Sequence, residues 1–90
     1  MLQEGILLSM IRSAVDSHDE QEIKKRKKLV IEILEKEMIE KYSNSYSEKQ
    51  LKREIKDMKR KMNIEIDKYI EKQIQIRDYM EEYFKKNVLS

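Results

Sequence analysis

The chain has 90 residues, of which 42% are charged and 39% hydrophobic, and its formal net charge is +2. A chain of this length forms at most one domain, and so small a net charge does not by itself indicate a polyanionic partner. Because the sequence has no cysteine, no proline and one glycine, disulfides, zinc–thiolate sites and thiol catalysis are excluded, and few residues would interrupt a helix.

The first predicted helix covers about residues 2–17 and carries apolar side chains on nearly all of its sides. A helix of this kind is either buried or in contact with lipid. Its apolar run falls short of the roughly 20 residues that span a bilayer, and the start of the sequence lacks the cationic region of a signal peptide. We therefore expect a cytoplasmic protein.

The second predicted helix covers about residues 19–42. Ser17 or Asp19 is expected to cap its N-terminus, and the early Glu20 and Glu22 are favourable beside the helix dipole. The polar stretch at about 43–46 then predicts a turn.

The third predicted helix covers about residues 47–86. Ser47 followed by Gln50 has the pattern of a capping box. From Leu51 to Tyr83, apolar residues recur at steps of three and four, which indicates a heptad-like seam along one face.

These elements predict an all-α fold over residues 1–90. It would be a long antiparallel helical hairpin, coiled-coil-like, with an additional N-terminal helix, completed as a dimeric helical bundle. If the turn centres near Asn44, facing residues have numbers that sum to about 89 or 90. Glu40 would then lie near Lys49.

A lone pair of helices has little interior for its surface, yet apolar residues occur on several sides of each predicted helix. Burial against a second copy would account for them, and two-fold dimers are the commonest oligomers. A monomeric three-helix bundle and a chain ordered only by another protein are the alternatives. The residues expected at the interface between copies are Leu2, Ile6, Met10, Leu29, Ile33, Ile64, Ile70 and Ile74.

Five consecutive cations occupy residues 24–28, and in the expected register they lie opposite a second basic run at residues 59–61. Five successive helical residues cover more than one turn and cannot all face one ligand, so a solvated helix surface is the simpler interpretation. The alternative is a basic belt that contacts nucleic-acid phosphates. Its candidate residues are Lys24, Lys25, Arg26, Lys28, Lys59, Arg60 and Lys61.

His18 is the one histidine and has acidic neighbours, including Asp16 and Asp19. A single histidine without a second fixed ligand is a weak metal signal, so a capping or surface role is expected and no metal or cofactor is predicted. Carboxylate pairs such as Glu65 and Asp67 point to different sides of a charged helix, and no catalytic residue is predicted.

Two tyrosines are candidates for contact with a protein partner. Tyr69 and Tyr83 lie on the predicted seam, whereas Tyr46 lies in the turn and Tyr79 lies off the seam. Because exposed aromatic residues are frequent in protein interfaces, Tyr46 and Tyr79 are the expected partner contacts.

The sequence thus predicts a small, non-enzymatic, helical adaptor or regulatory protein. It would form a homodimer and bind another, unidentified protein through an exposed helical face. The alternative is a dimeric nucleic-acid-binding protein, and attachment to a membrane surface through the first helix is a third, less favoured interpretation.

Overall fold

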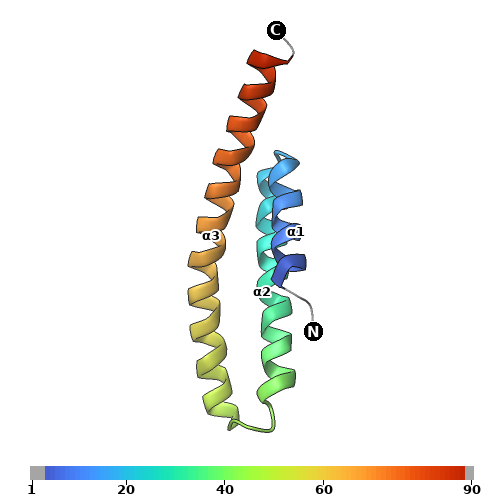
Figure 1. Ribbon diagram of the computed structural model, residues 1–90. Helices are drawn as coiled ribbons and strands as arrows, with labels where there is room; N and C mark the ends of the chain where they lie inside the picture. Colours follow the sequence, from blue (N-terminus) through green and yellow to red (C-terminus); the bar gives the residue numbers. More distant parts are fainter. Residues whose placement is uncertain (1–3, 89–90) are drawn as a thin grey trace.

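The computed structural model describes residues 4–88, which form three α-helices and no strand (Figure 1). The helices are α1 (Glu4–Asp16), α2 (Glu20–Tyr42) and α3 (Glu48–Asn87). The predicted all-helical class is confirmed. α2 and α3 run antiparallel beside each other, and α1 folds back to contact both of them (Figure 1). The result is an elongated body of 61 × 21 × 17 Å.

Side-chain caps mark the beginnings of both long helices. At the N-terminus of α2, the carboxylate of Asp19 accepts hydrogen bonds from the backbone N–H groups of Gln21 and Glu22, at 3.0 and 3.3 Å. At the N-terminus of α3, the hydroxyl of Ser47 accepts from the backbone N–H of Gln50 at 3.2 Å. Each cap satisfies backbone donors that the first turn of a helix leaves without a partner.

The core lies where α1 meets the two long helices. The buried side chains are apolar, and most of them come from α1, although it is the shortest helix. Half-buried residues of all three helices, among them Met62 and Tyr69, surround this cluster. One side of α1 is therefore buried by α2 and α3 of the same chain. The buried set in residues 4–88 is Leu7, Ile11, Ala14, Val15, Val30 and Ile66.

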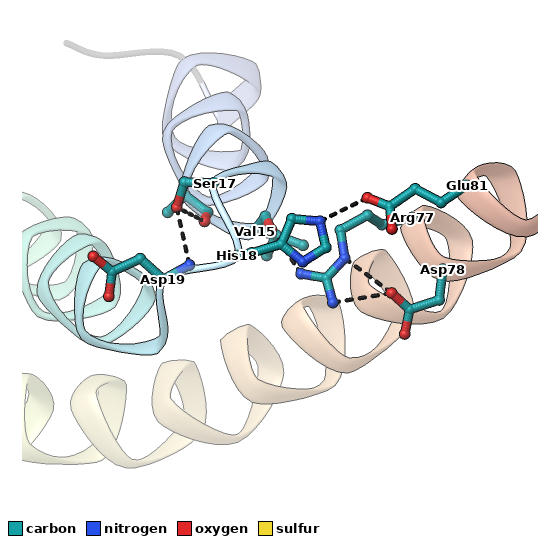
Figure 2. A network of polar contacts seen from close by, with 8 residues as sticks. Val15, Ser17, His18, Asp19, Arg77, Asp78 and Glu81 are labelled. Carbon is teal, nitrogen blue, oxygen red and sulfur yellow. Dashed lines mark hydrogen bonds and ion pairs between the residues drawn. The ribbon is translucent and has the colours of Figure 1, made fainter. Parts of the chain in front are cut away.

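The turn between α1 and α2 is attached to α3 by two side-chain contacts (Figure 2). Arg77 donates from Nη1 to the backbone carbonyl of Val15 at 2.8 Å, and its side chain is only 15% exposed. Nε2 of His18 lies 2.6 Å from a carboxylate oxygen of Glu81. These contacts hold the C-terminus of α1 and the start of α2 beside Arg77 and Glu81 of α3. The last turns of α3 extend past this level (Figure 1).

The ion pairs between α2 and α3 differ from the expected register. Lys27 contacts Asp67 at 2.6 Å, and Glu35 contacts Lys59 at 2.9 Å. The residue numbers sum to 94 in both pairs, instead of about 89 or 90 as expected from the turn. Helical side chains lean toward the N-terminus of their own helix by about one position, which raises the expected sum by about two and accounts for part of this difference.

Replacing Ile11 by Ala should strongly destabilise the fold. Ile11 is 1% exposed at the centre of the core, and truncation of such a side chain lowers the unfolding free energy by about 2–5 kcal/mol. The matched change Ile39→Ala, at a residue 42% exposed on α2, should have an effect of about 0.5 kcal/mol or less. Urea unfolding followed by circular dichroism measures both values, and equal effects would contradict the central position of α1.

Candidate functional site

The largest set of exposed apolar side chains lies at the C-terminal end of α3. Six such residues are between 46% and 67% exposed, and three of them are aromatic. The rings of Tyr83 and Phe84 meet edge to face, with centroids 6.4 Å apart. We call this surface the α3 end face. It consists of Ile76, Tyr79, Met80, Tyr83, Phe84 and Val88.

The end face continues the stripe by which α3 packs against the other helices. Met62, Ile66 and Tyr69 pack in or around the core. Ile76 and Tyr83 follow Tyr69 at intervals of seven residues, which keeps them on the same side of the helix. α1 ends and α2 begins near the level of Arg77 and Glu81. Arg12 and Asp16 of α1 line a groove with Ile76, Met80 and Phe84. The last turns of α3 extend past the described parts of α1 and α2 (Figure 1).

A second apolar surface lies on the outer side of α1 and α2. Ile6 is 47% and Leu29 is 42% exposed, while Met10 and Ile33 are half-buried against the core. Ile6 and Met10 line a shallow groove that also includes Arg26 of α2. Leu29 and Ile33 lie three and seven residues after Arg26, on the same side of α2. We call Ile6, Met10, Leu29 and Ile33 the α1–α2 face.

The remaining residues expected between copies do not gather into one surface. Ile64 is 51% exposed on α3, whereas Ile70 and Ile74 are half-buried against the core. Leu2 lies outside the described residues. Part of the predicted set is covered in the same chain because α1 folds back onto α2 and α3.

The two tyrosines expected to contact a partner have different surroundings. Tyr79 belongs to the end face and is its most exposed residue. Tyr46 is half-buried and stacks on Tyr42, with ring centroids 5.1 Å apart and an interplanar angle of 11°. Tyr42 also lies under the amine of Lys41, at 5.3 Å. Tyr46 therefore packs the turn between α2 and α3, and of the two tyrosines only Tyr79 is largely exposed.

Carboxylates neutralise much of the predicted basic belt. Asp57 contacts Arg60 at 2.8 Å and Lys61 at 3.0 Å. Two further cations of the belt pair with glutamates: Arg26 with Glu22 and Lys59 with Glu35, each at 2.9 Å. The expected convergence of like charges is thus relieved by local acidic partners. Lys24, Lys25 and Lys28 make no ion pair within residues 4–88.

The cations of the belt also face different sides of the molecule. Lys24, Lys28 and Lys59 line one groove between α2 and α3, together with the acidic Glu32 and Glu35. In contrast, Arg26 lines the groove beside α1. Arg26 therefore lies on a different side of α2 from Lys24 and Lys28.

Within the described part of the chain, no group of three or more acidic or histidine side chains is placed to hold a metal ion. His18 contacts Glu81 instead. None of the described helices has the length and apolarity to cross a membrane. Comparison of the sequence with models of protein families gave no match, and neither did comparisons with curated proteins and with solved structures.

Sequence reasoning missed the end face as a surface, because it assigned Ile76, Met80 and Tyr83 to a seam that a second helix would cover. The signal that could have revealed it is the difference in helix length. α2 has 23 residues and α3 has 40, so α3 outreaches its neighbour by several turns. Phe84 directly follows Tyr83, the last residue of the predicted seam, and the spacing of apolar residues did not indicate its exposure.

Asp57 should contribute a pH-dependent stabilisation. Hydrogen bonds from Arg60, and then from Lys61, lower the pKa of its carboxyl group below the ordinary value. A lowered pKa means that the ionised carboxylate stabilises the folded chain, and this stabilisation disappears as the pH falls through the folded-state pKa. The difference in thermal midpoint between the wild type and Asp57→Asn should therefore be present at about pH 6 and vanish by about pH 2.

The control for this experiment is the double variant Arg60→Gln, Lys61→Gln, in which Asp57 lacks both hydrogen-bond donors. In that background, Asp57→Asn should give little pH-dependent difference. An unchanged pH profile in that background would show that the two cations are not the cause.

Proposed function

We propose that the chain is a small, non-enzymatic helical adaptor that self-associates and binds another protein through an exposed helical face. In this proposal the three helices form one half of a dimeric, coiled-coil-like bundle. The observation that carries it is the α3 end face, where six large apolar side chains lie exposed on one end of a highly charged chain.

The arrangement of these side chains supports an interaction surface. Single exposed apolar residues are normal on protein surfaces, but contiguous patches mark contacts with other molecules. The end face is contiguous along the helix because Ile76, Met80 and Tyr83 continue the stripe of α3, and Tyr79 and Phe84 lie on its two sides. It is also rich in aromatic residues, which are enriched in protein interfaces and dominate their binding energy.

The presence of two separate apolar surfaces supports an adaptor. The end face lies on the last turns of α3, whereas the α1–α2 face lies beside the core. An adaptor needs one surface for its own copies and another for a different protein. We assign the different protein to the α1–α2 face, whose groove suits the apolar side of a partner helix. This assignment exchanges the roles expected from the sequence, in which Ile6, Met10, Leu29 and Ile33 lie between copies and Tyr79 contacts a partner.

The nucleic-acid alternative has weaker support. Phosphate binding depends on unpaired cations gathered on one surface. Among the described residues, Lys24, Lys25 and Lys28 are the belt cations that contact no carboxylate. Three lysines on the polar side of a helix are also what an ordinary solvated surface contains.

Leu29→Glu should abolish binding of the partner protein, because it places a charge in the α1–α2 face. Ile39→Glu is the matched control, since Leu29 and Ile39 are both 42% exposed on α2 and Ile39 lies outside this face. The measurement is quantitative mass spectrometry of proteins captured from host extract by each tagged variant. Proteins retained by Ile39→Glu and lost with Leu29→Glu would support the proposal, whereas an identical set with both would contradict it.

Duplex and single-stranded DNA should show no specific shift with the purified chain in a gel assay at low salt. A shift that weakens steeply as salt is raised would instead support phosphate contacts. In that case the double variant Arg26→Glu, Arg60→Glu should abolish it. Such a result would replace the adaptor proposal by the nucleic-acid alternative.

A further inference from the structure

The space that α1 fills between α2 and α3 continues past the first residue of α1. α1 begins at Glu4, and beyond this level α2 and α3 continue to their turn (Figure 1). A hollow of about 610 Å³ lies where α1 begins. A second hollow reaches from there to Tyr42 beside the turn, and Leu34, Glu37 and Met62 line both. We call the two hollows together the open groove.

Most of the lining of the open groove is apolar. Beside α1 it includes the buried core residues Val30 and Ile66. Toward the turn it includes Met38, Met58 and Met62, which are half-buried. Methionine side chains are flexible and polarisable, so a surface that contains several of them adapts to the shape of a bound molecule.

The part of the open groove beside α1 is acidic. Glu4, Glu37 and Glu65 line it, one from each helix, and no lysine or arginine of residues 4–88 does so. Lys41 lines the other end, where its amine lies 5.3 Å from the centre of the Tyr42 ring. This acidic lining contrasts with the net charge of the whole chain, which is +2.

The glutamates lie on the same sides of their helices as the apolar lining. On α2, Glu37 follows Leu34 by three residues, and on α3, Glu65 lies between Met62 and Tyr69 at spacings of three and four. At about 100° per residue, these spacings keep each set within roughly 60° around its helix. The carboxylates and the apolar side chains therefore face the same groove.

We propose that the open groove binds an amphipathic helix of another protein, with basic residues beside its apolar side. α1 already packs as a helix between α2 and α3 further along, so this space accepts a helix. The apolar side of the bound helix covers the methionines, and its lysines or arginines pair with the glutamates. The inference goes beyond the proposed function, because the open groove shares no residue with the α1–α2 face or the end face.

The contact that Glu65 makes within the chain does not prevent this binding. Its carboxylate lies 3.7 Å from the amine of Lys68, and the two side chains are 62% and 69% exposed. An exposed pair of this kind contributes little and rearranges readily. Glu4 is also exposed, so both carboxylates can reach cations of a bound helix.

The first test measures the preference for charge with two fluorescent peptides. One is an amphipathic helix of leucine and lysine, and the other has glutamate in place of every lysine. By fluorescence anisotropy, the lysine peptide should bind the full chain at least about tenfold more tightly than the glutamate peptide. Because the net charge of the chain is +2, it does not favour a cationic peptide, and equal affinities would overturn the proposal.

Two variants of equal net charge test the glutamates. Glu4→Gln, Glu65→Gln should weaken binding of the lysine peptide at least about tenfold. Glu32→Gln, Glu71→Gln is the matched control, because neither residue lines the open groove, and it should bind like the wild type. Circular dichroism checks that both variants are helical. An equal loss with both variants would show that the peptide binds outside the groove and would overturn the proposal.

The methionines locate the bound peptide without any change to the groove. Met38, Met58 and Met62 line it, whereas Met10 belongs to the α1–α2 face and Met80 to the end face. In NMR spectra of the methyl groups, the first three signals should shift when the lysine peptide is added, and the other two should not. Single Met→Leu variants assign the signals. Shifts confined to Met10 or Met80 would overturn the proposal.

Other occupants of the open groove give different results. If a chain that begins at Glu4 binds the lysine peptide at least about tenfold more tightly than the full chain, residues 1–3 occupy the groove and the proposal is overturned. If the methyl signals of Met58 and Met62 shift with protein concentration as the chain dimerises, the occupant is a second copy, which also overturns it. Leu29→Glu should bind the peptide like the wild type, so this test and that of the proposed function can fail separately.

Discussion

The packing of α1 against both long helices is the contact on which the rest of the structure depends. Its 13 residues include Leu7, Ile11 and Val15, which form one buried cluster with Val30 and Ile66. Two helices alone would share a narrow seam, with little interior for their surface. A helix as short as α1 is also only marginally stable by itself in water. Formation of α1 and formation of the core are therefore one event.

The position of α1 also determines which apolar residues stay exposed. It covers the stripe of α3 as far as the contacts of Arg77 and Glu81 with the α1–α2 turn. At and beyond these contacts the stripe is only partly covered, with Arg12 and Asp16 of α1 beside Ile76, Met80 and Phe84, and it forms the end face. On the opposite side, Ile6 of α1 and Leu29 of α2 stay exposed because α3 lies on the other side of both helices. Both candidate surfaces thus follow from the placement of one short helix.

Features set by neighbouring residues could be predicted from the sequence. The caps formed by Asp19 and Ser47 depend on backbone groups two or three residues away, so the local pattern was sufficient. The all-helical class followed from the lack of proline and the regular apolar spacing. In these cases the interacting groups lie within a few residues of each other, so a short stretch of sequence contains the whole pattern.

Features set by distant residues could not be predicted in detail. The pairs of Lys27 with Asp67 and of Glu35 with Lys59 depend on how side chains lean across two helices. By contrast, the neutralisation of Arg60 and Lys61 by Asp57 at i,i+3 and i,i+4 was available from the spacing in the sequence. The exposure of Tyr83 depends on where α2 begins relative to α3. The spacing of apolar residues along the sequence indicates which side of a helix a residue faces, but not whether another helix covers that side.

The backbone at His18 ties the course of the chain to its attachment. Its φ of 60° lies in the left-handed region, which costs a residue with a side chain about 1–2 kcal/mol relative to the right-handed one. Glycine would relieve that cost, but it has no ring nitrogen to reach Glu81. At position 18 the backbone conformation favours glycine, whereas the contact with α3 requires a histidine side chain. The backbone strain at His18 is therefore linked to its contact with Glu81, 63 positions further along the chain.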